Sequence, residues 1–175
     1  MPNQDILEGK RVLIVDDEPD ILETLEELLD VCLIDTAPDF ESGKKFLEKN
    51  DYDVAILDIM GVQGYDLLRI ATQKGVPCLM LTAHALSPDN LVKSLKEGAH
   101  SYIPKDKISE IPTFVSEILE VSRKGRQERD VRWYKRLKPF FDKKFGKGWR
   151  EKDKAFWKDF DRRYIASKDE LQDIL

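Results

Sequence analysis

The chain has 175 residues, 41% of them hydrophobic and 36% charged, with a net charge of −5. This length allows one ordinary domain and a smaller extension. The first residues contain no apolar run typical of a signal peptide, and no stretch approaches the roughly 18 apolar residues of a membrane span. We therefore expect a cytoplasmic protein, with Cys32 and Cys78 as reduced thiols in its core.

Charge is distributed unevenly along the chain. Residues 1–120 carry 24 acidic and 11 basic side chains, whereas residues 121–150 carry 3 acidic and 12 basic ones. Such a change in surface charge is typical of two units with different surroundings. The predicted division is a first domain over residues 1–122 and an extension over residues 123–175.

The first domain alternates between two kinds of segment. Five short apolar segments, 11–15, 31–37, 53–57, 77–82 and 100–103, are predicted to be buried strands. Five segments with helical spacing follow them: 19–29, 39–50, 64–74, 88–97 and 109–122. Alternating strands and helices predict an α/β fold, a doubly wound parallel sheet with helices on both faces. Ligands of such sheets bind beyond the carboxyl ends of the strands.

Polar residues stand at those strand ends. Asp16 and Asp17 follow the first strand, Asp58 the third, Thr82 the fourth and Lys105 the fifth. Three carboxylates at one edge need compensating positive charge, and Mg²⁺, which prefers carboxylate and phosphate oxygens, supplies it. A lysine and a hydroxyl nearby would suit a phosphoryl group, with Asp58 as a carboxylate nucleophile.

The motifs VDDE, LDIM, LTA and SYIPK, in this order, carry a resemblance. Over about residues 10–122 the chain resembles the CheY-like receiver domain of bacterial two-component response regulators. The resemblance implies a flavodoxin-like (βα)5 fold with strand order 2-1-3-4-5. It also implies a phosphorelay in which a sensor histidine kinase transfers a phosphoryl group to an aspartate.

The family's metal and acceptor residues have counterparts here. By this resemblance Asp58 is the phospho-acceptor that becomes an aspartyl phosphate. Asp17 would bind Mg²⁺ directly, and Asp16 mainly through water. Met60 stands where the family offers a backbone carbonyl to the metal.

The resemblance also implies the residues that respond to phosphorylation. Thr82 matches the hydroxyl that binds a phosphoryl oxygen, and Lys105 the lysine that pairs with the aspartate and then the phosphate. Tyr102 occupies the aromatic switch position, where the ring turns inward as the hydroxyl shifts. His84, two residues past Thr82, is at a position from which it could tune dephosphorylation together with Met60.

Two local features depart from the family pattern. The segment DIMGVQG reaches Gly64 sooner than the family's loop and lacks its proline. The family's lysine is normally followed by proline in a cis peptide, whereas Asp106 follows Lys105 here. A non-proline cis bond costs about 2.5–4 kcal/mol, so the sequence leaves the isomer of this peptide open.

The extension is basic and rich in aromatic residues. We expect two helices joined at residues 145–149, with Pro139 kinking or restarting the first, and a short helix or tail over 167–175. The helical spacing is carried by Tyr134, Leu137, Phe141, Phe145, Trp149, Phe156, Phe160 and Tyr164.

Several functions of the extension stay open at this point. Its aromatic side chains could pack inside the hairpin and against the receiver, or they could form a homodimer face or a docking surface for another protein. The face of segments 88–97, 100–103 and 109–122 is another candidate dimer surface. Basic residues interleaved with aromatic ones also suit nucleic acid, which we favour less.

An enzymatic alternative is an aspartate-nucleophile phosphatase with a DxD motif. That motif needs an acid two positions after the nucleophile, where this chain has Met60. We therefore expect a signalling protein that assists only its own phosphoryl chemistry, and no enzyme that turns over an outside substrate.

Overall fold

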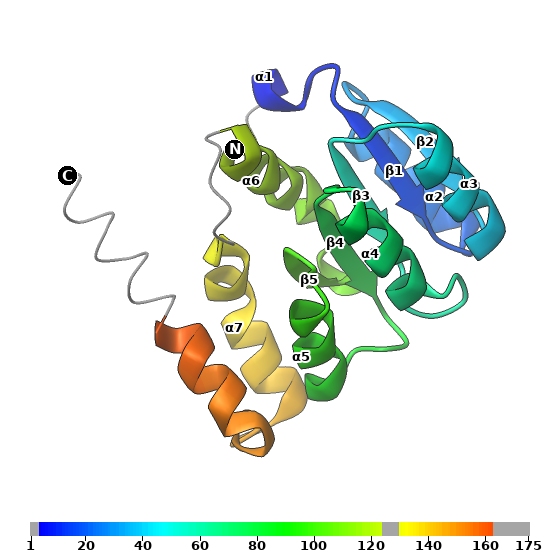
Figure 1. Cartoon of the computed structure of the whole chain (residues 1–175). Helices are drawn as coiled ribbons and strands as arrows, with labels where there is room; N and C mark the ends of the chain where they lie inside the picture. Colours follow the sequence, from blue (N-terminus) through cyan, green and yellow to red (C-terminus); the bar gives the residue numbers. More distant parts are fainter. Residues whose placement is uncertain (1–3, 124–129, 163–175) are drawn as a thin grey trace.

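The computed structural model describes residues 4–123 and 130–162. Its centre is a sheet of five parallel strands in the order β2-β1-β3-β4-β5 (Figure 1). The predicted flavodoxin-like arrangement is confirmed. The strands are β1 (Arg11–Val15), β2 (Leu33–Ala37), β3 (Val54–Leu57), β4 (Cys78–Thr82) and β5 (Ser101–Pro104).

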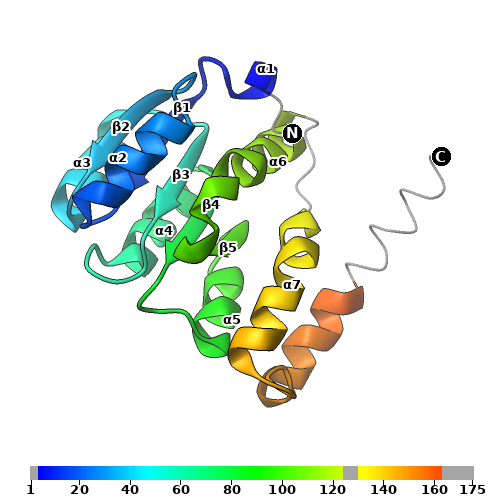
Figure 2. The same cartoon turned by 180° about the vertical axis from the view of Figure 1, so that it is seen from behind.

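Helices cover both faces of this sheet. Helices α2 and α6 pack together on one face, which lies in front in Figure 2, and α3 and α4 pack together on the other, in front in Figure 1. The helices up to this point are α1 (Gln4–Leu7), α2 (Pro19–Leu28), α3 (Phe40–Lys49), α4 (Gly64–Gln73), α5 (Pro88–Lys96), the 3-10 helix η1 (Lys105–Glu110) and α6 (Ile111–Arg123).

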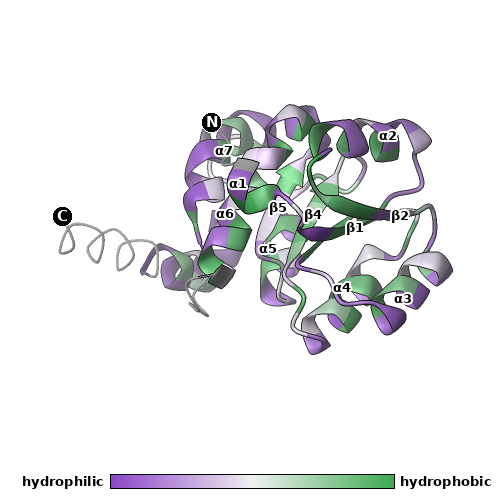
Figure 3. Cartoon of the chain, turned by 90° about the horizontal axis from the view of Figure 1, so that it is seen from above, coloured by the Kyte–Doolittle hydropathy of each residue, from purple (hydrophilic) through white to green (hydrophobic). Residues whose placement is uncertain are grey.

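The sequence explains where these elements form. All residues of β3 and β4 are buried, as expected for inner strands of a sheet covered on both faces. Proline occupies the first turn of α2 and α5, where its missing N–H is no loss. The Ser87 side chain accepts a hydrogen bond from the Asn90 backbone N–H and so caps α5. Figure 3 shows the resulting pattern, with hydrophobic strands and with helices that are hydrophobic on one side only.

A few boundaries differ from the predicted ones. Strand β2 begins at Leu33, because the Cys32 N–H closes a turn on the Leu29 carbonyl at 2.9 Å. The last receiver helix is preceded by the 3-10 helix η1, which was not predicted. Nor was the four-residue helix α1, whose Ile6 and Leu7 are buried in the core.

The extension forms a helical hairpin, called the C-terminal hairpin below (residues 132–162). Helix α7 (Arg132–Phe145) leads through a turn to the 3-10 helix η2 (Glu151–Asp153) and a helix over 154–162. Both views show the two arms side by side (Figures 1 and 2). Gly146 and Gly148 in the turn have φ of 89° and 76°, a region that glycine adopts readily.

Two expectations about the extension need comment. The idea that Pro139 restarts the helix is wrong, because α7 continues through it to Phe145. The predicted helix or tail over 167–175 lies outside the described residues, as does Tyr164. Among the residues that the structure describes, no helix is long and apolar enough to cross a membrane.

Candidate functional site

Three strands bring charged side chains to one edge of the sheet. Asp16 follows β1, Asp58 follows β3 and Lys105 follows β5. The Asp16 N–H donates to the Ala37 carbonyl, and the Asp58 N–H to the Val15 carbonyl, so the ladder of hydrogen bonds fixes both backbones. The two carboxylates are 1% and 3% exposed. Burial of adjacent acids is unfavourable without compensating charge, so this edge of the sheet needs positive charge close to the two carboxylates.

Lys105 supplies part of this positive charge. Its Nζ lies 2.9 Å from Asp16 Oδ2, 3.2 Å from Asp58 Oδ2 and 3.5 Å from Glu18 Oε2. Burial alone would lower the pKa of Lys105, but Asp16 and Asp58 outweigh it and raise that pKa. The lysine is therefore an ammonium that binds both buried carboxylates.

One ammonium does not neutralise the cluster. Burial, followed by the charge of Asp16, raises the pKa of Asp58 to about 6. Burial also raises the pKa of Asp16. Asp17 is exposed, and one oxygen each of Asp16, Asp17 and Asp58 lie within 4.8 Å of one another. The ionised form of this trio is thus short of positive charge.

The donor set suits a hard divalent cation. Asp16 Oδ2 is buried and faces the Lys105 ammonium without a well-oriented hydrogen bond. Clustered carboxylate oxygens with one side open to solvent are the ligands that Mg²⁺ prefers in proteins. The residues present therefore fit the metal that the sequence predicts.

The short loop after Asp58 closes over these acids. At Gly61, whose φ is 86°, an added Cβ would lie 2.3 Å from Asp17 Oδ2. At Gly64 it would lie 2.0 Å from the Asp58 carbonyl oxygen. Neither position tolerates a side chain in this arrangement. Sequence reasoning did not identify Gly61 as part of the site, although two glycines in the segment DIMGVQG are a signal of close backbone approach.

Thr82 and Tyr102 are linked through the segment after β4. Thr82 ends β4 opposite Pro104, the residue before Lys105. Its Oγ1 accepts a hydrogen bond from the Ala85 N–H at 3.1 Å. The Tyr102 hydroxyl donates to the Ala85 carbonyl at 2.7 Å and accepts from the Ser87 N–H at 3.1 Å. Both side chains are fully buried. The two hydrogen bonds of its hydroxyl direct the Tyr102 ring inward, toward the segment that follows Thr82.

The remaining predicted residues lie at the rim. Met60 is 52% exposed. His84 Nε2 lies 3.6 Å from Glu18 Oε1, and Glu18 also reaches Lys105. Sequence reasoning missed Glu18 as a partner of the lysine, although it is the last residue of VDDE. The Lys105–Asp106 peptide, whose isomer the sequence left open, is trans.

The aromatic residues of the extension face one another. The ring centroids of Trp149 and Trp157 lie 5.2 Å apart, and those of Tyr134 and Phe160 lie 4.9 Å apart. Trp133, Tyr134 and Trp157 are buried. These rings contact one another rather than standing free for stacked bases, and the nucleic-acid alternative is not favoured.

Comparisons with known proteins agree with this geometry. The family model "Response regulator receiver domain" matches residues 12–115. The Arabidopsis thaliana "Two-component response regulator ARR18" is 37% identical over 103 residues, which cover 55% of this chain and 16% of that protein. The Bacteroides fragilis "Transcriptional regulatory protein RprY" is 31% identical over 144 residues, covering 79% of this chain and 61% of that protein. The chain thus spans only part of the length of the curated relatives it matches.

Solved structures show the same fold. A CheY-like receiver domain protein from Methanospirillum hungatei superposes with a TM-score of 0.62 at 28% identity, covering 67% of this chain and 99% of that one. The BeF3-activated DrrB receiver domain superposes with a TM-score of 0.56 at 25% identity, covering 64% of this chain and 98% of that one. The predicted resemblance is confirmed: this chain belongs to the response regulator receiver family, whose domains act in phosphorylation-dependent signalling with sensor histidine kinases.

Proposed function

We propose that Asp58 accepts a phosphoryl group from a sensor histidine kinase and that the phosphorylated chain signals by contact with another protein. The observation that carries the proposal is the buried Asp58 carboxylate, 3.2 Å from the Lys105 ammonium and within 4.8 Å of oxygens of Asp16 and Asp17. A buried carboxylate with a strongly shifted pKa beside a lysine is a candidate for reactivity.

The acids have a shared role in this proposal. Asp16, Asp17 and Asp58, with the backbone carbonyl of Met60, would hold Mg²⁺. When bound, the metal supplies positive charge for the oxygens of the incoming phosphoryl group. Receiver domains of this family bind Mg²⁺ through acidic residues, and the clustered oxygens here support the same use.

The transfer step needs an ionised nucleophile. Because the pKa of Asp58 is about 6, the carboxylate form predominates at neutral pH. One of its oxygens attacks phosphorus, the P–N bond to the kinase imidazole breaks, and an acyl phosphate forms. Lys105 pairs with the new dianion. The Thr82 Oγ1 already accepts a hydrogen bond from the Ala85 N–H. The Thr82 hydroxyl therefore donates its hydrogen to a phosphoryl oxygen.

The output follows from Tyr102. Its hydroxyl is bonded to the segment that follows Thr82, so a shift of that segment changes the position of the ring.

We infer that the chain works as two units, a receiver over 1–122 and an extension over 123–175. The cytoplasm remains the location that we predict for it.

Catalysis on an outside substrate is not part of the proposal. Receiver domains of this family are generally signalling domains without enzymatic turnover. The DxD phosphatase alternative needs an acid at position 60, and Met60 has no ionisable group.

Incubation with acetyl phosphate and Mg²⁺, followed by intact-mass measurement, tests the proposal. We expect the wild type to gain one phosphoryl group and Asp58→Asn to gain none. A matched control is Asp66→Asn, because the Asp66 side chain is half-exposed in α4 and pairs with Arg69 at 2.8 Å, and Asp66 is not one of the clustered acids. Equal labelling of wild type and Asp58→Asn would reject Asp58 as the acceptor.

The role of His84 in tuning dephosphorylation is a smaller part of the proposal. Its contact with Glu18, which also reaches Lys105, supports an influence on the rim of the site. The phosphoryl half-life should change in His84→Ala. Identical decay in the two proteins would remove this role.

A further inference from the structure

The C-terminal hairpin covers the switch tyrosine. Helix α7 packs beside β5 (Figure 1). The centroid of the Phe141 ring lies 6.1 Å from that of the Tyr102 ring. Both side chains are 0% exposed. The contact joins the two units at the residue that the receiver would use as its switch. The face made by α5, β5 and α6 is therefore occupied by the chain's own hairpin, and a homodimer through that face would require the hairpin to leave.

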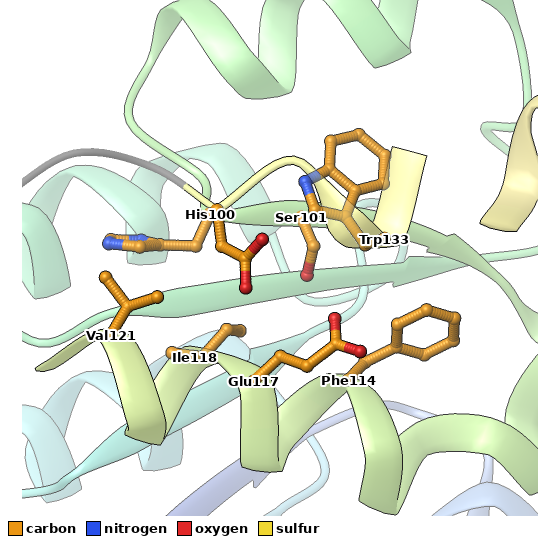
Figure 4. A pocket seen from close by; sticks show the side chains of 8 residues that line it. His100, Ser101, Phe114, Glu117, Ile118, Val121 and Trp133 are labelled. Carbon is orange, nitrogen blue, oxygen red and sulfur yellow. The ribbon is translucent and has the colours of Figure 1, made fainter. Parts of the chain in front are cut away.

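Charged pairs hold the hairpin against this face. Arg136 of α7 pairs with the buried Glu117 of α6, and Arg132 lies 3.4 Å from Glu120. Lys152 lies 3.0 Å from Asp89 of α5. Figure 4 shows the small pocket at this seam, where Glu117 of α6, Ser101 of β5 and Trp133 of α7 come together. The basic extension thus meets acidic side chains of the receiver, in agreement with their opposite net charges.

A continuous path leads from the acceptor edge to the hairpin. The Ala85 N–H bonds Thr82, and the Ala85 carbonyl accepts from the Tyr102 hydroxyl. The Tyr102 ring then contacts Phe141. Because Ala85 bonds to both side chains, a shift of Thr82 would displace the residue to which the Tyr102 hydroxyl is bonded. The Tyr102 ring cannot leave its buried position on the hairpin side unless Phe141 gives way, because the interior is closely packed.

We propose that Phe141 is a positioning residue that holds Tyr102 in its inward conformer, so that hairpin docking and phosphorylation of Asp58 stabilise the same state of the receiver. The inference rests on the proposed function of Asp58. Coupling of two sites is reciprocal in binding free energy. Docking therefore increases the affinity of the site for a phosphoryl group or its mimic, and occupancy of the site tightens the docking.

The tryptophans of the chain report whether occupancy of the site tightens hairpin docking. All three tryptophans, Trp133, Trp149 and Trp157, lie in the hairpin. Beryllofluoride with Mg²⁺ serves as the phosphoryl mimic, and its binding is followed by ¹⁹F NMR. In the wild type we expect binding to slow hydrogen exchange across α7. The wavelength of the tryptophan emission should not move to the red. Undocking would shift the emission to the red.

Matched variants test the role of Phe141. Phe141→Leu removes the ring that touches Tyr102. Phe145→Leu makes the same change one helical turn later, where Phe145 stacks on Phe141 at 5.4 Å and contacts Trp149. Among the described ring contacts, none joins Phe145 to Tyr102. We expect Phe141→Leu to weaken apparent beryllofluoride affinity about fivefold or more, and Phe145→Leu to weaken it much less.

A third variant separates positioning from simple packing. Tyr102→Phe keeps the ring against Phe141 but removes the hydroxyl that reaches Ala85 and Ser87. In this background Phe141→Leu should no longer change beryllofluoride affinity, and binding should no longer slow exchange in α7. Circular dichroism confirms that each variant is folded.

The outcomes are distinct. Weaker binding in Phe141→Leu that disappears in Tyr102→Phe supports the inference. Unchanged or tighter binding in Phe141→Leu overturns it, since tighter binding would mean that the hairpin opposes the phosphorylated state. Failure of the wild type to bind beryllofluoride would overturn this inference and the proposed function together, whereas binding without any effect on α7 would overturn this inference alone.

Discussion

The receiver fold and the C-terminal hairpin bury their side chains in different ways. In the receiver, aliphatic residues of a parallel sheet are covered by the receiver's own helices, and β3 and β4 are buried along their whole length. In the hairpin, aromatic rings meet in pairs, such as Phe141 stacked on Phe145 at 5.4 Å. Phe141 also contacts Tyr102 of the receiver. The comparison shows an aliphatic core formed around the sheet and an aromatic core that joins it through the contact of Phe141 with Tyr102.

This difference predicts separable losses of stability. Leu13 in β1 and Leu137 in α7 are 0% and 1% exposed. Leu13→Ala should lower the free energy of unfolding of the receiver by about 2–5 kcal/mol through the cavity it leaves. Leu137→Ala should mainly release the hairpin. Denaturant titrations followed by circular dichroism and by tryptophan fluorescence report the two regions separately, because every tryptophan lies in the hairpin.

The two signals give a clear test. In Leu137→Ala the fluorescence midpoint should move to lower denaturant while the main dichroism transition stays in place. If both transitions move together in both variants, the hairpin and the receiver unfold as one unit and the comparison is wrong.

One of the charge pairs at the seam between the two regions has a buried acid. Arg136→Met would leave the Glu117 carboxylate, which is only 6% exposed, without the arginine with which it pairs. We expect hairpin docking to weaken by about 1–3 kcal/mol, the cost of an unsatisfied buried polar group. The double variant Arg136→Met, Glu117→Gln should recover part of this loss. A single variant that docks as well as the wild type would show that the pair has no net effect.

The acidic edge should respond to pH in a defined direction. The pKa of Asp58 is raised from 3.8 to about 6, so its protonated form is favoured in the fold over a wider range than in the unfolded chain. The ionised form destabilises the metal-free fold, and this penalty is relieved as pH falls through about 6. Protons then compete with Mg²⁺, so Mg²⁺ affinity should fall roughly tenfold for each pH unit below that value. Titrations across this range check the slope, and a flat profile would contradict it.

The smallest effect is expected at the outer contact of the hairpin. Lys152 and Asp89 form a solvent-exposed pair at 3.0 Å. Exposed pairs contribute about 0.2–1 kcal/mol, and salt screens them. Lys152→Ala should therefore change hairpin docking little at low salt and not at all at high salt. A loss as large as that of Arg136→Met would mean that this exposed pair stabilises docking as much as the pair with the buried Glu117 does.

The sequence predicted the receiver well because its signals are local. Apolar runs marked the strands, and Asp16, Asp58 and Lys105 came together because parallel strands end at one edge. The contact of Phe141 with Tyr102 joins residues far apart in the sequence, and helical spacing alone does not say what a helix packs against. The approach of Gly61 to Asp17 was missed because it depends on the path of a loop.

The central claim is that three carboxylates at the sheet edge share one divalent cation. Calorimetric titration of Mg²⁺ into the wild type and Asp17→Asn tests it most directly, because Asp17 is exposed and its change leaves the buried pair with Lys105 in place. We predict a single bound ion in the wild type and a large loss of affinity in Asp17→Asn. No Mg²⁺ binding in the wild type, or equal binding in both proteins, would contradict the account.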